Sequence, residues 1–140
     1  MALRLTIITP ERVIVDKDVD EVVAPGWLGQ FGVLPGHARF ITLLNIGELV
    51  YRVGNEEEHL ALNWGFAEIN QTKMTVLVET AEFDHEIDYK RALAAKQRAE
   101  EEMKKISMDD ARYEAIEAAL KRALLRLEIY QKYGNKQRTL

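Results

Sequence analysis

The chain has 140 residues, of which 47% are hydrophobic and 30% charged, a balance typical of a small globular protein with one core or a core and an appendage. It has no cysteine, which excludes disulfide bonds and thiol chemistry, and no apolar run reaches the ~18–20 residues of a membrane-spanning helix. Residues 1–85 hold 6 basic and 13 acidic side chains, whereas residues 86–140 hold 13 basic and 10 acidic ones. This asymmetry predicts two units with different partners, and it is too mild to indicate nucleic-acid binding.

Residues 1–84 are expected to form an antiparallel β-sandwich. The N-terminal MALRLTIITP runs directly into a strand pattern and does not have the pattern of a signal peptide. Apolar residues then alternate or come in short runs, with turn signals between them every ~8–12 residues, which favours a sandwich or barrel. The apolar positions of this pattern are Leu3, Leu5, Ile7, Val13, Val15, Val19, Val22, Val23, Leu49, Tyr51, Val53, Leu60, Leu62, Phe66, Ile69, Met74, Val76 and Val78.

The segment 24–38, APGWLGQFGVLPGHA, holds four of the eight glycines and two of the three prolines. Large apolar side chains stand between the glycines, so the segment is not a flexible linker. A phosphate-binding loop is excluded as well, because no lysine follows the last glycine and strand-like sequence comes next. From turn chemistry alone, the segment is predicted to be a long, well-packed turn region.

After Asp84 the apolar residues recur in steps of three and four, as on one face of a helix. The break lies at 106–110, where Ser107 or Asp109 is available to cap the second helix. So short a connection predicts an antiparallel two-helix hairpin over residues 85–140, and with it an α+β fold. The apolar stripes are rich in alanine, which buries little area, so the hairpin is expected to be weakly held and able to open as a switch. The stripes are Ala92, Ala95, Ala99, Met103 and Ile106, then Ile116, Leu120, Ala123, Leu127 and Tyr130.

Residues with catalytic or metal-binding chemistry do not cluster in this sequence. His37, His59 and His85 lie on separate segments without the spacing of a metal site, and neither a Ser-His-Asp order nor a nucleophile elbow is present. Trp27 and Trp64 are expected in packing or in an interface rather than at a cofactor. We therefore expect a non-catalytic subunit or a binding module, without a metal.

Four segments resemble the epsilon subunit of rotary, F-type ATP synthases. The glycine-rich segment resembles the family pattern G-x-x-G-x-x-G-[IV]-L-P-G-H, and 64–69 (WGFAEI) resembles G-G-[FI]-x-E-V with Trp64 in place of the first glycine. Residues 74–82 (MTVLVETAE) resemble V-T-[VI]-L-x-x-x-A-E, and 87–92 (IDYKRA) fit I-D-x-x-R-A at every fixed position. The segments follow the family's order and spacing over nearly the whole chain.

The resemblance implies a central-stalk subunit of a proton-translocating ATP synthase. In the family, the β-sandwich binds the gamma subunit and the ring of c subunits. The helical pair rises along gamma toward the α/β catalytic head and inhibits ATP hydrolysis. The expected location is peripheral, on the cytoplasmic face of a bacterial cell membrane. The expected interface residues are Trp27, Gln30, Phe31, His37 and Thr42, with Gln30 standing where some members carry an acid that faces the ring.

A regulatory ATP site is a further expectation, with ATP as a ligand and no cofactor required. Arg122 and Arg126 lie four residues apart on one helix face, and a closed hairpin would bring them near Asp88 and Arg91, so that guanidinium groups could converge on phosphates. Glu82 and Asp88 could accept hydrogen bonds from a purine amine or a ribose. In some bacterial family members, residues at these five positions bind ATP. The alternatives that stay open are a helix N-cap for Asp88 and a solvated face for the two arginines of the second helix.

Two other classes of function are compatible with the residues. One is a stand-alone ATP-sensing module whose hairpin closes on the nucleotide, and the other is a plain β-sandwich adhesion or scaffold module. A stand-alone sensor should lack an exposed apolar patch, whereas a stalk subunit should show one that includes Trp27 or Phe31.

Overall fold

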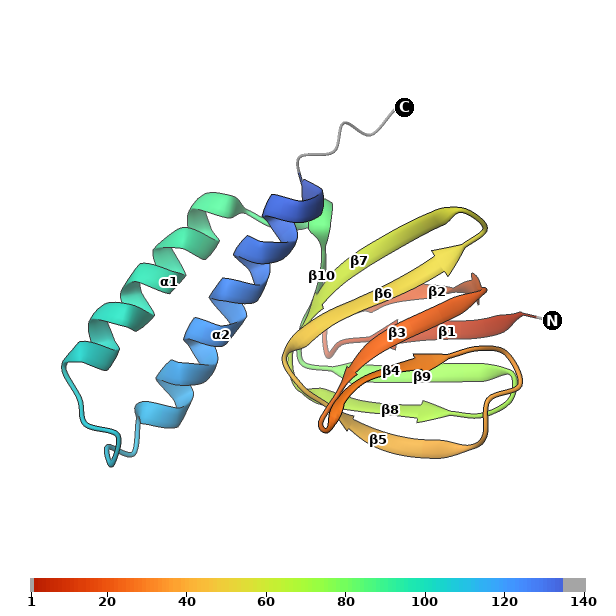
Figure 1. Ribbon diagram of the computed structural model, residues 1–140, viewed down its shortest axis with the longest axis horizontal. Coiled ribbons are helices and arrows are strands. Elements are labelled where there is room, and N and C mark those ends of the chain that lie inside the picture. Colours follow the sequence, from red (N-terminus) through yellow and green to blue (C-terminus); the bar gives the residue numbers. More distant parts are fainter. Residues whose placement is uncertain (1, 135–140) are drawn as a thin grey trace. The chain divides into compact units, whose positions relative to one another are not determined.

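The computed structural model describes residues 2–134, and the chain divides into two compact units, Met1–Phe83 and Asp84–Leu140 (Figure 1). The first unit is made of strands and the second of helices, which confirms the predicted fold class. The strands are β1 (Leu3–Ile8), β2 (Val13–Val19), β3 (Glu21–Gly26), β4 (Gly29–Val33), β5 (Phe40–Leu44), β6 (Gly47–Val53), β7 (Glu56–Leu62), β8 (Gly65–Ile69), β9 (Lys73–Val78) and β10 (Ala81–Phe83).

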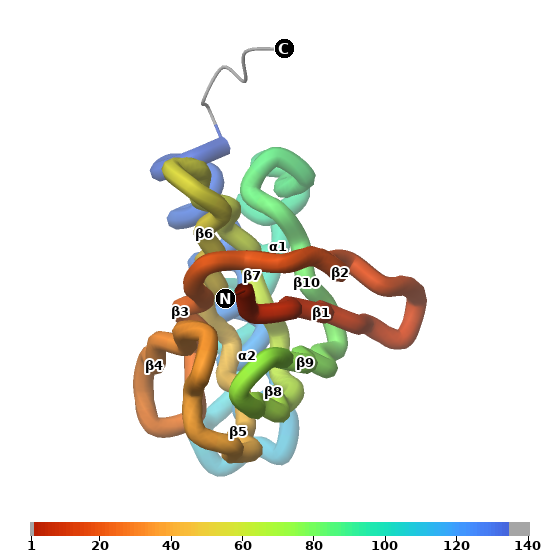
Figure 2. Tube along the Cα trace, turned by 90° about the vertical axis from the view of Figure 1, so that its right-hand side faces the viewer, coloured from red at the N-terminus to blue at the C-terminus, as the bar shows by residue number. Residues whose placement is uncertain are grey.

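The strands of the first unit form one sheet in the order β10-β7-β6-β3-β5-β8-β9-β1-β2, with β4 paired to β3 off this path. β2 contacts β6 without being paired to it, so the sheet closes on itself around a core. One pairing corrects the prediction of antiparallel strands throughout, because β1 and β9 run parallel, side by side in Figure 2. No hairpin joins these two strands, and the local alternation of residues therefore leaves their relative direction open.

The alternation predicted from the sequence positions the core. Leu3, Leu5 and Ile7 are completely buried, and Arg4 between them is exposed. Phe66 departs from the prediction, because the inward positions of β8 are those of Ala67 and Ile69. Residue 66 has the opposite parity and faces outward, since successive side chains of a strand alternate between its two faces. Val13 and Val53, at the ends of β2 and β6, are exposed as well.

The glycine-rich segment is more regular than predicted. Most of it forms the β3–β4 hairpin, whose strands pair from Val22 with Val33 to Gly26 with Gly29. Trp27 and Leu28 make up the two-residue turn between the strands. Gly29 has a φ of +130°, a conformation that side chains disfavour, and this explains the glycine directly after the turn.

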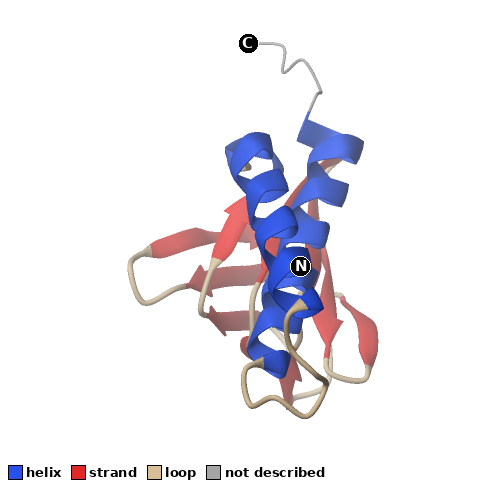
Figure 3. Ribbon diagram, turned by 90° about the vertical axis from the view of Figure 1, so that its left-hand side faces the viewer, coloured by secondary structure: helices blue, strands red, loops and turns tan. Residues whose placement is uncertain are grey.

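The second unit is a helical hairpin. A 3₁₀ turn, η1 (Asp84–Glu86), leads into α1 (Tyr89–Lys104), and α2 (Tyr113–Ile129) ends in a π-helical turn, η2 (Tyr130–Gly134). Figure 3 shows the two helices side by side, as predicted. In the described part of the chain, neither helix combines the length and the apolar character needed to cross a membrane.

The predicted cap of the second helix is wrong. The N-cap position of α2 is Arg112, whose side chain makes no capping hydrogen bond. Asp110 takes the role expected of Ser107 or Asp109, because its Oδ1 accepts a hydrogen bond from the Arg112 backbone nitrogen at 2.9 Å. The same carboxylate accepts bonds from Nε and Nη2 of Arg112 at 3.0 and 2.9 Å. This pairing within the connection places the start of the helix a few residues later than the sequence suggests.

Candidate functional site

The first turn of α1 carries two of the residues predicted to bind nucleotide. Asp88 is the N-cap, and its Oδ1 accepts a hydrogen bond from the Arg91 backbone nitrogen at 3.2 Å. The helix cap considered for Asp88 is therefore observed. This first turn contains Lys90 and Arg91 and no acidic residue. Both positive side chains add to the positive end of the helix dipole, which is unfavourable for the isolated helix and favourable for a bound anion.

The hairpin brings the start of α1 to the end of α2. The rings of Tyr89 and Tyr130 have their centroids 5.1 Å apart, at an interplanar angle of 36°. Arg126 lies one turn before Tyr130, and Arg122 one turn before that, both half-buried, whereas Arg91 is exposed. The backbone therefore places Arg91 and Arg126 toward the same end of the hairpin. The convergence of their guanidinium groups with that of Arg122 stays a prediction.

The fifth predicted nucleotide residue belongs to the other unit. Glu82 lies on β10 opposite Ala61 of β7 and is half-buried. Its role toward a nucleotide stays a prediction. Arg91, Arg122 and Arg126, with Asp88 beside them, are suited to bind a polyanion, because guanidinium groups form charge-assisted hydrogen bonds with phosphate oxygens.

The second candidate site is the outer surface near the glycine-rich hairpin. At its tip, the side chain of Trp27 is 58% exposed and that of Leu28 fully exposed. Gln30 is exposed on β4. The tip is held against the sheet, because the Trp27 backbone nitrogen donates to the Leu43 carbonyl oxygen at 3.0 Å. Two large apolar side chains on a rigid turn suit contact with another protein.

The other three predicted interface residues are half-buried. Phe31 packs edge to face on Phe40, with ring centroids 5.6 Å apart, and lies against the core. The His37 ring is 5.1 Å from that of Phe40, and its Nδ1 is 2.7 Å from the Ala38 carbonyl oxygen. The Thr42 hydroxyl donates to the Leu43 carbonyl oxygen at 3.2 Å. Each of these side chains therefore contacts other parts of the sandwich, in addition to any contact that it makes with a partner.

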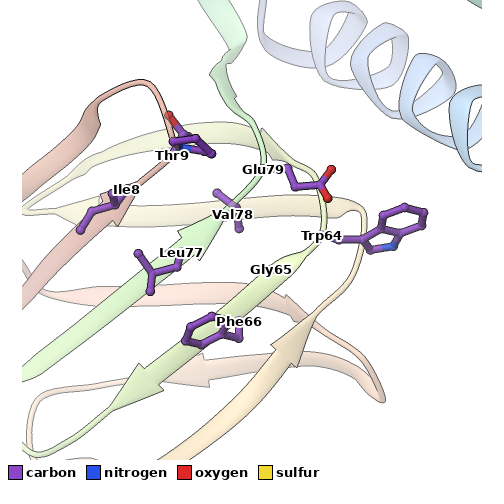
Figure 4. Close-up of a pocket in the computed structure, with 9 residues that line it drawn as sticks. Ile8, Thr9, Trp64, Gly65, Phe66, Leu77, Val78 and Glu79 are labelled. Atoms are coloured by element: carbon purple, nitrogen blue, oxygen red, sulfur yellow. The ribbon is translucent and has the colours of Figure 1, made fainter.

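The sequence prediction missed a row of apolar side chains on the outer face of the sheet. Register places Ile8 beside Leu77, Leu77 beside Phe66, and Phe66 beside Leu43, across β1, β9, β8 and β5. We call these four residues the outer row. Ile8, Leu77 and Phe66 of this row line an open groove of about 460 Å³ (Figure 4). The other residues that line the groove are Thr9, Pro10, Trp64, Gly65, Val78 and Glu79. In the sequence, the row could have been suspected from apolar residues at positions that face outward, such as Leu43 and Phe66. That these residues are neighbours becomes visible only when the strand register is known.

Two ionisable groups with shifted pKa values lie away from these sites. Burial, with a smaller contribution from Glu58, raises the pKa of Tyr51 to about 12. Hydrogen bonds from the Arg112 side chain and backbone lower the pKa of Asp110 to about 2. Tyr51 belongs to the core and Asp110 to the connection between the helices, so both shifts reflect packing and local structure.

Two family models match the chain in succession. The β-sandwich domain of the ATP synthase delta/epsilon chain matches residues 2–84, and the long α-helix domain of the same chain matches residues 85–131. The chain is also similar to the ATP synthase epsilon chains of Geobacter sulfurreducens and Geotalea uraniireducens. It is 51% and 49% identical to them over 134 residues, which cover 96% of this chain and 97% of each relative.

Solved structures show the same fold. A chain of the Euglena gracilis mitochondrial ATP synthase, in a structure of OSCP, F1 and the c-ring, aligns with a TM-score of 0.77 and 25% identity. That alignment covers 91% of this chain and 79% of the other. A chain of the central stalk and c-ring of the Tetrahymena thermophila enzyme aligns with a TM-score of 0.56 at 15% identity, over 96% and 98% of the two chains, and shows the fold alone.

Proposed function

Because the chain belongs to the delta/epsilon chain family of ATP synthases, we propose that it is the epsilon chain of a bacterial-type, proton-translocating enzyme. In this role it is a non-catalytic central-stalk subunit that couples c-ring rotation to the catalytic head. It lies peripherally on the cytoplasmic face of the membrane. The observation that carries the proposal is the match of both family models, in order, over residues 2–131, together with near-complete coverage of relatives named ATP synthase epsilon chain.

The sandwich unit is proposed to bind the gamma subunit and the c-ring through Trp27, Gln30, Phe31, His37 and Thr42. The exposed apolar turn supports this, because a fully exposed Leu28 beside an exposed Trp27 is typical of a surface that binds another protein and not of a protein that works alone in water. The same observation favours the stalk subunit over a stand-alone ATP sensor.

The helical unit is proposed to restrain ATP hydrolysis by contact with the α/β head. Residues 86–140 hold 13 basic and 10 acidic side chains, which suits an acidic surface on the partner. The test is ATP hydrolysis by an α₃β₃γ complex alone, with the full chain, and with a chain that ends at residue 84. We expect both chains to bind the complex and only the full chain to slow hydrolysis. Failure of the full chain to bind would overturn the function, and equal rates with both chains would overturn the inhibitory role.

ATP is proposed as a regulatory ligand of the closed hairpin, held by Asp88, Arg91, Arg122 and Arg126, with Glu82 as a further contact. The positive first turn of α1 and the adjacent end of α2 support this. A ligand that binds the closed hairpin better than the open one shifts the population toward the closed state.

Calorimetric titration of the full chain with ATP tests the site. Charge-assisted hydrogen bonds contribute about 1.5–3 kcal/mol, so Arg91→Ala or Arg126→Ala should each weaken binding about tenfold or more. Arg98→Ala, which removes another exposed arginine of α1, is the matched control and should leave affinity unchanged. Absence of heat up to millimolar ATP, or equal affinity in all variants, would contradict the nucleotide site. Asp88 would then be a helix cap only, and the arginines would be part of a solvated helix surface.

A further inference from the structure

β2 is an edge strand of the sandwich. It ends the strand order of the sheet, and among the residues that the structure describes its backbone pairs with β1 alone. β2 also contacts β6, but the two strands are not paired. One side of Val13–Val19 therefore presents backbone N–H and C=O groups that no second strand satisfies. Such an edge is a template on which a strand of another chain can pair, and proteins that stay monomeric protect it.

Two carboxylates stand on the outward face of this edge. Asp16 and Asp18 are both exposed, and both form ion pairs with Arg4 of β1, at 3.0 Å from its Nε and 3.4 Å from its Nη1. The Thr6 hydroxyl also donates to Asp16 Oδ1 at 3.3 Å, which holds that carboxylate against the sheet. One guanidinium group thus serves two carboxylates, so the outward face of the edge keeps a negative charge.

A lysine occupies the core-facing position between these carboxylates. Lys17 lies opposite the completely buried Leu5 of β1. It shares its face of the strand with Val15 and Val19, which are both buried. Lys17 is nevertheless exposed, and its Nζ lies 5.8 Å from the centroid of the Tyr51 ring. The stem of the side chain thus follows the apolar face while the ammonium group stays in water, where it forms no ion pair with a described residue.

These three charges oppose pairing with β2 of a second copy. Two such strands would pair antiparallel about a two-fold axis, with their core-facing sides continuous and one residue opposite itself. The register that pairs the whole strand has Asp16 on the axis, so two identical carboxylates face each other. With Lys17 on the axis, two ammonium groups face each other and Asp16 of each copy faces Asp18 of the other. Like charges directly opposite across a strand pair are destabilising, and the core-facing ammonium groups would also lose contact with water.

From this arrangement we propose that Asp16, Lys17 and Asp18 close the β2 edge to a second copy of the chain, and that Lys17 is the residue on which this closure depends. The carboxylates already pair with Arg4, whereas the ammonium group is without an ion pair and stands on the core-facing side. A valine at position 17 would complete a run of valines at alternate positions 13–19, a pattern that favours association through a strand edge. The inference concerns the free chain and does not rest on the proposed function.

Light scattering of the full chain after size separation, over about a hundredfold range of concentration, tests the proposal. We expect wild type to be monomeric and Lys17→Val to self-associate, with a dissociation constant at least about tenfold lower than that of wild type. Lys17→Arg and Lys17→Glu should both stay monomeric, because each keeps a charge on the core-facing side of the edge. Lys73→Val is the matched control, since Lys73 is an exposed lysine of β9, a strand that is paired on both sides. Circular dichroism checks that each variant is folded.

A cysteine at the same position locates the contact. The chain has no cysteine, so Lys17→Cys both removes the charge and reports on pairing through β2. Residues directly opposite across an antiparallel pair have Cβ atoms about 4.5–5.5 Å apart, close to the spacing of a disulfide bond. With oxidised glutathione as the oxidant, we expect Lys17→Cys to form a disulfide-linked dimer at least about tenfold faster than the control Lys73→Cys, as for a tenfold higher population of the paired state.

A folded Lys17→Val that stays monomeric would overturn the proposal, as would equal rates of disulfide formation in the two cysteine variants. Self-association of Lys17→Val that the added change Phe66→Ser abolishes would place the contact on the outer row and would also overturn it. If wild type itself self-associates as strongly as Lys17→Val, Lys17 does not close the edge. If Lys17→Val does not fold, the comparison of Lys17→Cys with Lys73→Cys decides the matter.

Discussion

Gly65 sets how closely β8 and β9 approach beneath the groove, and replacing it tests the packing directly. A Cβ added at Gly65 would overlap the Leu77 carbonyl oxygen and would lie 2.7 Å from the Val78 Cα and 2.8 Å from its Cγ1. Two of these three atoms belong to the backbone of the paired strand, which cannot move without disturbing the ladder. Overpacking of this kind costs about 1–3 kcal/mol and occasionally more, and a backbone clash belongs at the upper end.

We therefore expect Gly65→Ala to lower the free energy of unfolding by about 3 kcal/mol. For a unit of this size, 1 kcal/mol shifts the melting temperature by about 4–8 °C, so the melt should fall by about 12–24 °C. Tryptophan fluorescence is the appropriate signal, because both tryptophans, Trp27 and Trp64, lie in the sandwich unit.

Gly32→Ala is the matched control for this experiment. No heavy atom lies within 4 Å of a Cβ added at Gly32, and its φ is not in the left-handed region. The control should melt at the wild-type temperature or slightly above it, since alanine lowers the entropy of the unfolded chain. A Gly65→Ala variant that melts within about 2 °C of this control would refute the reasoning.

Three further predictions concern other parts of the chain. A chain that ends at residue 84 should keep a cooperative melt by circular dichroism, because every residue of the buried core cluster lies between Leu3 and Val78; a gradual, non-cooperative loss of signal would contradict this. The pKa of Tyr51 is raised from 10 to about 12, so the folded state holds the phenolic proton more tightly than the unfolded state does. The free energy of unfolding should therefore fall as the pH rises from 10 to 12. In urea titrations, a Tyr51→Phe variant should show a smaller fall over this pH range. Arg112→Ala should return the pKa of Asp110 from about 2 toward its usual 3.8, as followed by NMR of the carboxyl carbon, and an unchanged titration would show that the side-chain hydrogen bonds from Arg112 do not cause the shift.

The sequence predicted the features of the fold that depend on neighbours in the chain. Alternation around Leu3, Leu5 and Ile7 identified buried strand positions, and the change of period after Asp84 identified the helices. The parallel pairing of β1 and β9 depends on contacts between residues about 70 positions apart, for which a period of two carries no information on direction. The capping of α2 was missed for a different reason, because three acceptors stood close together and Arg112 selected Asp110 through its side chain as well as its backbone.

The candidate sites likewise divide into features that depend on neighbours in the chain, which the sequence predicts, and features that depend on strand pairing, which it does not. The hairpin places Asp88 and Arg91 in one turn and brings Arg126 to the same end, as the helical spacing and the short connection implied. The outer row could not be read from the sequence, because Ile8, Leu43, Phe66 and Leu77 come from four separate segments. Only the register of three strand pairs makes them neighbours.

The packing of the helical unit explains how a small ligand could control it. Among the described residues of this unit, the buried apolar side chains larger than alanine are Ile87, Leu127 and Ile129, which lie where α1 begins and α2 ends, and the other buried apolar positions are alanines. Alanines bury little area and the larger apolar side chains beyond this end are half-buried or exposed, so the rest of the hairpin is packed less tightly than the end where α1 begins and α2 ends. A nucleotide at ~100 times its dissociation constant would stabilise the closed state by about 2.7 kcal/mol, which is comparable to burying one further leucine, about 1.5–3 kcal/mol. Because Arg91 and Arg126 lie at the well-packed end, the nucleotide proposed to bind there would add its stabilisation to the contacts that keep the hairpin closed, and loss of the nucleotide would remove that stabilisation.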